Sequence, residues 1–242
     1  MAMAGRYFSL VFLLIVFPAC RADEKRVEQK KPGPTAIILK QRRPVLSADQ
    51  RTELGFPADL IADIELAAGG EAEPFFATEV VHSENLKGEA EFEQKKLAGF
   101  SVRTKNTDEL IASRRAGLRA RGYLIFKSHR GYGSLPDIVT VVKGRSSYDI
   151  LKMQGTEAPE YQIGTKEIVA WLKERQNDAA FVITGAGADW LEARFIKPPH
   201  NIRLFAKKAA AFAPDVLGRG PLSLNKLAGS MEQMNGFYLV WD

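Results

Sequence analysis

Cysteine is the scarcest chemically reactive residue in this sequence of 242 residues, and its scarcity excludes several kinds of site. Cys20 is the only cysteine, and it lies in an apolar N-terminal segment. Once Cys20 is lipidated or removed, no thiol remains for a disulfide bond, a zinc–thiolate site or a cysteine nucleophile. The three histidines are scattered and form no HExxH pattern, which excludes a zinc-protease helix. We therefore expect a domain with no bound metal and no cofactor.

Motifs for phosphate binding and serine hydrolysis are also absent. The sequence contains no Gly-Lys-Ser/Thr P-loop and no GxSxG elbow. The stretch TGAGADW, residues 184–190, begins like a dinucleotide-binding turn, but the third glycine of that fingerprint is replaced by Trp190. No long amphipathic helix follows to receive a pyrophosphate. A nucleotide site is thus not expected, while a Ser-His-Asp arrangement formed only in space stays open.

The basic excess of the chain is confined to its N-terminal part. The formal net charge is +5, and residues 21–50 contain eight Lys or Arg against four Asp or Glu. Residues 51–242 carry equal numbers of basic and acidic side chains. Binding to duplex nucleic acid needs a basic face that releases counterions from phosphates. We therefore predict no nucleic-acid partner.

The first twenty residues, MAMAGRYFSLVFLLIVFPAC, have the form of a secretory signal peptide. Cys20 stands where bacterial lipoprotein signals place the lipidated residue, although Phe17 replaces the usual leucine of the lipobox. A lipid on Cys20 would anchor the protein to a membrane of the cell envelope. The alternative is ordinary cleavage after Ala22, which would give a soluble periplasmic or secreted protein.

Residues 21–45 are charged and contain Pro32-Gly33-Pro34, which indicates a solvated linker. Within it, TAIIL (35–39) offers a short first strand. No later segment approaches eighteen consecutive apolar residues, so no other membrane span is expected. We predict a single domain over residues 46–242.

Apolar periodicity predicts helices and strands that alternate along this domain. A capping box at Ser47 and Gln50 begins the first helix, and a second helix runs from Pro57 to Gly69. Further helices are expected from Asn106 or Thr107 to Gly122, over 146–153 and 166–175, and from Asn201 and Ser223 onward. Strands are expected over 74–81, around 100–102, and over 122–128, 137–143, 179–183 and 237–241. WLEARFIK (190–197) fits a short helix or a strand equally well.

Because strands 122–128 and 137–143 form a hairpin and helices come in pairs, the pattern favours an α+β fold over a strict βαβ repeat. We expect a mixed or antiparallel sheet with paired helices packed on it.

The remaining candidates for chemistry lie around the glycine turn and a later proline turn. Carboxylates at these two turns could form a catalytic pair if they converge in space. The commoner roles are an N-cap for Asp189 and a turn residue for Asp215. The candidate ligand-binding residues are Gly185, Gly187, Asp189, Trp190, Glu192 and Asp215.

Two larger groups of side chains have ordinary structural explanations. Arg114, Arg115, Arg119 and Arg121 follow one another on a predicted helix, and such runs usually form a solvated face. The aromatic residues of the second half fit a hydrophobic core better than a ligand platform. These residues are Trp171, Trp190, Phe195, Phe212 and Trp241.

The second half of the chain resembles the bacterial Domain of Unknown Function 4253 family. The resemblance rests on an ordered series of segments from about Gly122 to Asp242, and residues 45–121 would form a less distinctive N-terminal part. The segments are GYLIFKS, VVKG with YDIL, QGT, ITGAGADWLEARF, PP, LFAKK, FAPDV, SLNKLA and YLVWD. The resemblance implies a shared fold and no defined activity.

The sequence departs from this family at two points. Ala213 replaces the cysteine of the family's FCPDV, and His200-Asn201 replaces an Asp-Trp pair after the prolines. A function that depends on that cysteine or that pair would not carry over to this chain.

Three functions fit these observations. The first is a non-catalytic binding domain at the cell envelope, with an unknown protein partner. The second is a carboxylate- or metal-dependent hydrolase built on Asp189, Glu192 and Asp215. The third is an immunity-like inhibitor of a toxin. We favour the first, because an export signal and a tether are present and no complete catalytic motif is found.

Overall fold

A computed structural model describes residues 44–85, 88–218 and 223–241. The expected signal peptide, Cys20 and the possible strand at 35–39 lie outside these described residues. The described residues belong to one compact unit. No helix within the described ranges is both long and apolar enough to cross a membrane.

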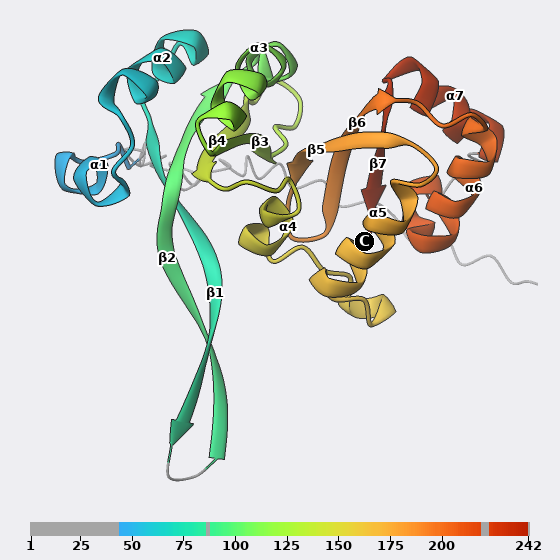
Figure 1. Cartoon of the computed structure of the whole chain (residues 1–242), viewed down its shortest axis with the longest axis horizontal. Helices are drawn as coiled ribbons and strands as arrows, with labels where there is room; N and C mark the ends of the chain where they lie inside the picture. The colour runs from blue at the N-terminus through green and yellow to red at the C-terminus, as the bar shows by residue number, and fades with distance from the viewer. Residues whose placement is uncertain (1–43, 86–87, 219–222, 242) are drawn as a thin grey trace, which may run out of the picture. The chain divides into compact units, whose positions relative to one another are not determined.

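Seven strands form one mixed sheet in the order β1-β2-β4-β3-β5-β6-β7 (Figure 1). Neighbouring strands are antiparallel except for β3 and β5, which are parallel. The strands are β1 (Glu73–Asn85), β2 (Gly88–Thr104), β3 (Tyr123–His129), β4 (Asp137–Lys143), β5 (Ala180–Ala186), β6 (Trp190–Lys197) and β7 (Gly236–Val240). The structure thus confirms the predicted α+β fold with a mixed sheet.

Helices lie between the strands along the chain, and most begin where the sequence predicts. Ser47 forms the expected capping box with Gln50 at the start of the first helix. The α-helices are α1 (Ala48–Leu54), α2 (Ala58–Ala68), α3 (Thr107–Ala120), α4 (Asp149–Gln154), α5 (Thr165–Arg175), α6 (Ile202–Phe212) and α7 (Leu224–Gln233). Two short 3-10 helices, η1 (Pro159–Tyr161) and η2 (Pro214–Leu217), also lie within the described ranges.

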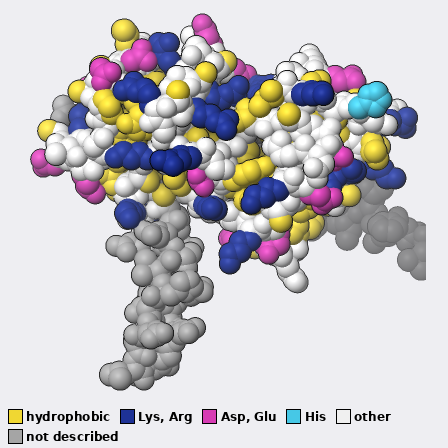
Figure 2. Space-filling model, viewed as in Figure 1, with side chains coloured by type: hydrophobic (Ala, Val, Ile, Leu, Met, Phe, Trp, Pro, Cys, Tyr) yellow, Lys and Arg dark blue, Asp and Glu magenta, His cyan; other side chains and the backbone are white. Residues whose placement is uncertain are grey.

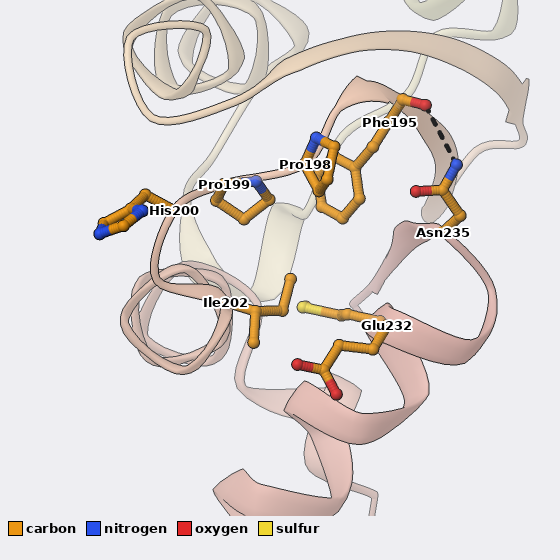
Figure 3. Close-up of a pocket in the computed structure, with 8 residues that line it drawn as sticks. Phe195, Pro198, Pro199, His200, Ile202, Glu232 and Asn235 are labelled. Atoms are coloured by element: carbon orange, nitrogen blue, oxygen red, sulfur yellow. Dashed lines mark hydrogen bonds between the residues drawn. The ribbon is translucent and has the colours of Figure 1, made fainter.

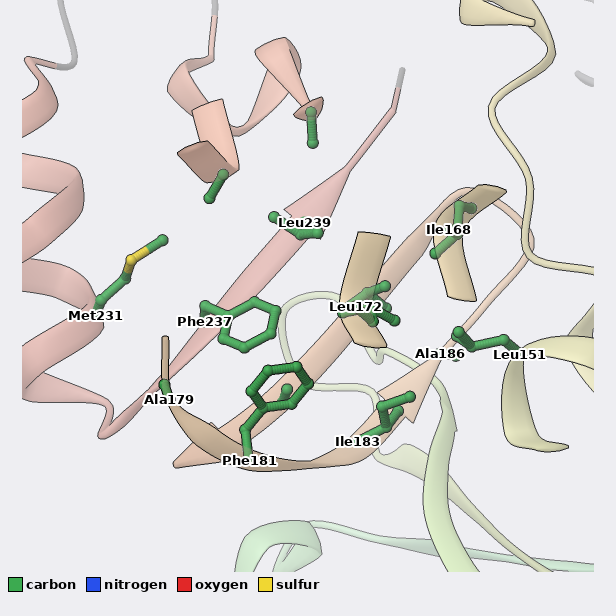
Figure 4. Packing of buried hydrophobic residues seen from close by; sticks show 14 of the residues in the cluster. Leu151, Ile168, Leu172, Ala179, Phe181, Ile183, Ala186, Met231, Phe237 and Leu239 are labelled. Atoms are coloured by element: carbon green, nitrogen blue, oxygen red, sulfur yellow. The ribbon is translucent and has the colours of Figure 1, made fainter. Parts of the chain in front are cut away.

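Each face of the sheet carries its own hydrophobic core, because successive side chains of a strand point to opposite faces. One core joins Phe100, Val102 and Val139 to α1, α2 and α3. The other joins Phe126, Ile183 and Leu191 to α4 through α7. Figure 4 shows part of this core, with Ile183 of β5 near Leu172 of α5. We call these two sides the α1–α3 face and the α4–α7 face. The core on the α1–α3 face includes no described residue of β5, β6 or β7, so this part of the face is free for polar side chains.

The first two strands form a hairpin that extends beyond the other strands (Figure 1). β2 pairs with β4 only over Gly99–Thr104, while its pairing with β1 begins at Gly88. The sequence predicts strands over 74–81 and around 100–102, whereas β1 and β2 in the structure are both longer than these predictions.

Candidate functional site

A buried ion pair lies at the centre of the α1–α3 face. The Nζ of Lys127 is 2.9 Å from a carboxylate oxygen of Glu192, and the side chains are 10% and 6% exposed. The sheet register explains how they meet. Lys127 of β3 is paired with Gly185 of β5, which is paired with Glu192 of β6. Because Gly185 has no side chain, the lysine can cross over β5 to reach the carboxylate.

Gly185 is closely enclosed by its neighbours. A Cβ added there would lie 3.1 Å from the Cβ of Lys127 and 3.1 Å from the ring of Trp190. The first glycine of TGAGADW therefore makes room for the lysine and the indole. This is a packing role and needs no bound phosphate.

Three further charged residues complete a network around the ion pair. Arg194 lies 3.3 Å from Glu192 and 2.9 Å from Asp108, which stands in the first turn of α3. Lys127 also lies 3.7 Å from Asp108 and 3.8 Å from Asp137. The buried charges of Lys127 and Glu192 are tolerated because each has an opposite charge within reach. The network fixes the first turn of α3 against β3 and β6.

The rest of TGAGADW forms a tight hairpin between β5 and β6. The N–H of Gly187 donates to the carbonyl of Trp190 at 2.9 Å, and a Cβ at Gly187 would overlap the indole nitrogen of that tryptophan. Since a strand follows this turn, no helix N-terminus is present to bind a pyrophosphate. The same observation settles WLEARFIK as a strand. Asp189 is exposed in this turn and caps no helix.

An arginine and two aromatic rings lie together on the α1–α3 face, next to the turn between β5 and β6. The guanidinium carbon of Arg130, from the β3–β4 loop, is 4.6 Å from the ring centre of Tyr238 and 6.0 Å from that of Trp190. The two rings are 6.0 Å apart. In the same loop, Tyr132 is 78% exposed. We call Arg130, Tyr132, Asp189, Trp190 and Tyr238 the Arg130 surface.

The surroundings of Tyr238 alter its acidity. Burial raises the pKa of the phenol above its ordinary value of 10.0, and the charge of Asp189 acts in the same direction. Arg130 opposes this rise, because a cation favours the phenolate. Tyr238 therefore stays protonated at neutral pH and can donate a hydrogen bond to a partner.

Asp215 and the charged network lie on opposite faces of the sheet. It stands in η2 and accepts a hydrogen bond of 2.8 Å from the hydroxyl of Tyr161. Its neighbours Val216 and Leu217 pack on the core of the α4–α7 face, whereas Glu192 points to the α1–α3 face. No group of three His, Cys, Asp or Glu side chains able to hold a metal occurs among the described residues. Glu192 and Asp215 are thus not brought together.

Two pockets lie away from the Arg130 surface. One, of about 300 Å³, lies between β6, α6 and α7 and is lined by Phe195, His200 and Glu232 among others (Figure 3). The other, of about 470 Å³, borders a chain of hydroxyl groups. In that chain the buried Thr140 hydroxyl lies 2.7 Å from the hydroxyl of Ser101 and 2.6 Å from that of Ser128.

The two departures from the family pattern have structural roles. Asn201 caps α6 by accepting a hydrogen bond of 2.9 Å from the N–H of Leu204. Ala213 is fully buried in the core of the α4–α7 face. Both positions therefore serve the packing of α6 in this chain.

The fold and these contacts define a mixed-sheet α+β domain in which one half of a sheet face carries polar and aromatic side chains. Residues 138–242 match the family described as Domain of unknown function (DUF4253). The C-terminal part of the chain thus carries a domain of this family, as its sequence resemblance predicts. No curated protein and no solved structure matches the chain.

Three residues of the site were missed by sequence reasoning. Lys127 and Arg130 lie at the end of β3 and just after it, Tyr238 lies in β7, and only the sheet brings them to Trp190 and Glu192. One signal was available, since Lys127 is the only charged residue in the largely apolar strand GYLIFKS. A lysine in a buried strand needs an acidic partner, although the sequence does not say which one.

Proposed function

We propose that this protein is an exported, envelope-associated binding domain without catalytic activity, and that it contacts a protein partner through the Arg130 surface. The observation that carries the proposal is the packing of Arg130 against Trp190 and Tyr238 beside the exposed Tyr132. Trp, Tyr and Arg are the residue types that contribute most energy at protein interfaces.

The state of the charged residues supports binding over catalysis. A general acid or base must come within hydrogen-bond reach of its substrate. Glu192 is 6% exposed and already engaged by Lys127 and Arg194. Asp215 lies on the other face of the sheet, where it accepts a hydrogen bond from Tyr161. Glu192 and Asp215 are therefore not positioned to act together on one substrate.

The chemistry of the surface suggests the chemistry of the partner. The rings of Trp190 and Tyr238 offer flat apolar area, while the exposed Arg130 offers a cation that is already held in place by the rings. A cation held in this way loses little conformational freedom on binding. We infer a partner that presents an acidic side chain flanked by apolar groups.

Cross-linking in living cells tests the partner surface. A photo-reactive amino acid at Tyr132 should yield one discrete cross-linked product, because this side chain is 78% exposed beside Arg130. The matched control is Leu66 of α2, which is 84% exposed and far from this surface in the fold. A product that forms equally from position 66, or that survives Arg130→Ala, would contradict the proposal.

Attachment to the envelope is tested separately. With a lipid on Cys20, the protein should be found in the membrane fraction, and Cys20→Ser should release it or leave it unprocessed. The mass of the processed chain distinguishes the two expected forms. A lipid adduct starting at Cys20 supports the anchor, whereas an unmodified chain starting at Asp23 indicates cleavage after Ala22. Retention of the full chain in the cytoplasm would contradict export.

A further inference from the structure

The arginines of α3 divide into two groups in the structure, although the sequence presents them as one run. Arg114 pairs with Asp63 of α2 at 2.9 Å, and Arg121 lies 3.7 Å from Asp59 of the same helix. Arg115 and Arg119 are one helical turn apart on another side of α3 and take no acidic partner among the described residues. The helix therefore has a neutralised side and an uncompensated side.

Arg115 is the more unusual of these two arginines because it is partly buried. Burial lowers the pKa of its guanidinium group, and the nearby positive charge of Arg119 lowers it further. Both causes disfavour the charged form, yet arginine keeps its proton in proteins. The side chain is thus a cation held in a poorly solvated place beside a second cation, which is an unfavourable arrangement for the chain alone.

A pocket lies directly beside Arg115. Its volume is about 360 Å³, and it is bounded by α3 on one side and by β5 and β6 on the other. Its polar lining comprises Arg115, Arg194, Asp108, Thr184 and Asn235. Lys and Arg side chains are numerous in the middle of the view in Figure 2, around α3 and the neighbouring strands. The volume is large enough for a small organic anion.

The charged side chains of the pocket differ in whether they already pair with other groups of the protein. Asp108 and Arg194 are paired at 2.9 Å, and Arg194 also donates to the backbone carbonyl of Met234. Arg115 has no such partner within the part of the chain that the structure describes, and its guanidinium donors point to a role in binding a ligand. The hydroxyl of Thr184 makes only a weak hydrogen bond, of 3.4 Å, to the backbone carbonyl of Glu192. It can rotate to donate to a ligand in the pocket instead.

We infer that the pocket between α3 and β5–β6 binds the oxyanion group of a small phosphorylated or carboxylated ligand, with Arg115 as its principal contact. A guanidinium group binds phosphate or carboxylate through two parallel hydrogen bonds. Such a ligand would neutralise the charge of Arg115, which has Arg119 as a second cation nearby. This site shares no residue with the Arg130 surface, so the inference does not depend on the proposed function.

Thermal unfolding of the full chain in mild detergent tests the site, with inorganic phosphate and malonate as probes at a constant ionic strength set by sodium chloride. At ten times its dissociation constant, a probe should raise the melting temperature by about 3 to 6 °C. Arg115→Gln should abolish this shift, whereas the neighbouring Arg114→Gln should retain it because Arg114 faces Asp63. A shift with phosphate alone indicates a phosphate site, and a shift with both probes indicates a general oxyanion site.

Three results would overturn the inference. They are no shift with either probe in the wild-type chain, an undiminished shift in Arg115→Gln, and an equal loss of the shift in both variants. Misfolding does not obscure the outcome, because Arg115→Gln removes an uncompensated charge and breaks no ion pair. Its melting temperature without added anion should therefore be no lower than that of Arg114→Gln, which does break one.

Discussion

Replacement of Lys127 by methionine should destabilise the domain strongly, because it leaves the carboxylate of Glu192 buried without its closest partner. Removing one member of a buried ion pair costs roughly 3–5 kcal/mol of unfolding free energy. Arg194 remains 3.3 Å from that carboxylate and compensates in part. We therefore expect a loss near the lower end, about 3 kcal/mol. For a domain of this size, that corresponds to a fall of about 6 to 12 °C in melting temperature.

Glu192→Met should cost somewhat more, about 4 kcal/mol, because Lys127 would then depend on carboxylates beyond hydrogen-bond distance. Asp108 and Asp137 lie 3.7 and 3.8 Å from its Nζ. One oxygen of Asp137 also accepts the N–H of Gly131 at 2.7 Å and is not free to move.

The variant with both substitutions should be less destabilised than either single variant. Removing Lys127 and Glu192 together leaves Arg194 paired with Asp108 at 2.9 Å, and the partly exposed Asp137 loses only a partner at 3.8 Å. Two apolar side chains of similar volume can replace a buried ion pair at little cost. Denaturant unfolding followed by circular dichroism measures all three free energies, if the transition is two-state.

Arg114→Met is the matched control for these variants, because its pair with Asp63 is exposed. Its cost should be about 0–1 kcal/mol. The reasoning is refuted if each single variant at the buried pair loses less than about 1 kcal/mol, or if the double variant loses the sum of the two.

Further predictions concern the glycine turn, the hydroxyl chain and the tyrosine of the Arg130 surface. Gly187→Ala should cost about 1–3 kcal/mol, since its methyl group overlaps the indole that packs on it, whereas Gly229→Ala in the open middle of α7 should stabilise by about 0.5–1 kcal/mol. Equal effects in denaturant unfolding would show that the close packing is not real. Thr140→Val should cost about 1–3 kcal/mol, because it leaves two serine hydroxyls without their shared partner, and a thermal melt that matches the wild type would contradict this. Since the folded state raises the pKa of Tyr238 above 10.0, its contribution to stability is present below pH 10.0 and is lost as pH rises through the folded pKa. Absorbance titration at alkaline pH should show this tyrosine ionising at still higher pH in Arg130→Ala, and an unchanged titration would argue against their contact.

The elements of the fold were largely predictable because each rests on local chemistry. The capping box at Ser47 and the hairpin of 122–128 with 137–143 are both present in the structure. WLEARFIK remained open in the sequence, because Leu191, Ala193 and Phe195 alternate as in a strand while Trp190 and Ala193 also share a helical face. Pairing with β5 and β7 settles this as a strand, and the sequence does not reveal such non-local pairing.

The candidate site was only partly predictable, for the same physical reason. The sequence marks Gly185, Gly187, Trp190 and Glu192 because they lie in one motif, and the structure keeps them on one hairpin. Their partners come from β3, the β3–β4 loop and β7, which the sheet order places beside them. The sequence groups Asp215 with Glu192 as carboxylates near two turns that could converge in space, but the alternation of β6 sends Glu192 to the opposite face.

The affinity of the cross-linked partner for purified variants tests the binding surface most directly. Arg130→Ala should weaken binding about 30-fold or more, because an interface hot spot contributes at least about 2 kcal/mol. Arg121→Ala is the matched control, since Arg121 also lies over a tyrosine ring, that of Tyr123, at 6.0 Å but belongs to another part of the domain. The account predicts that only Arg130→Ala loses affinity. Equal affinities for the wild type and Arg130→Ala would contradict it.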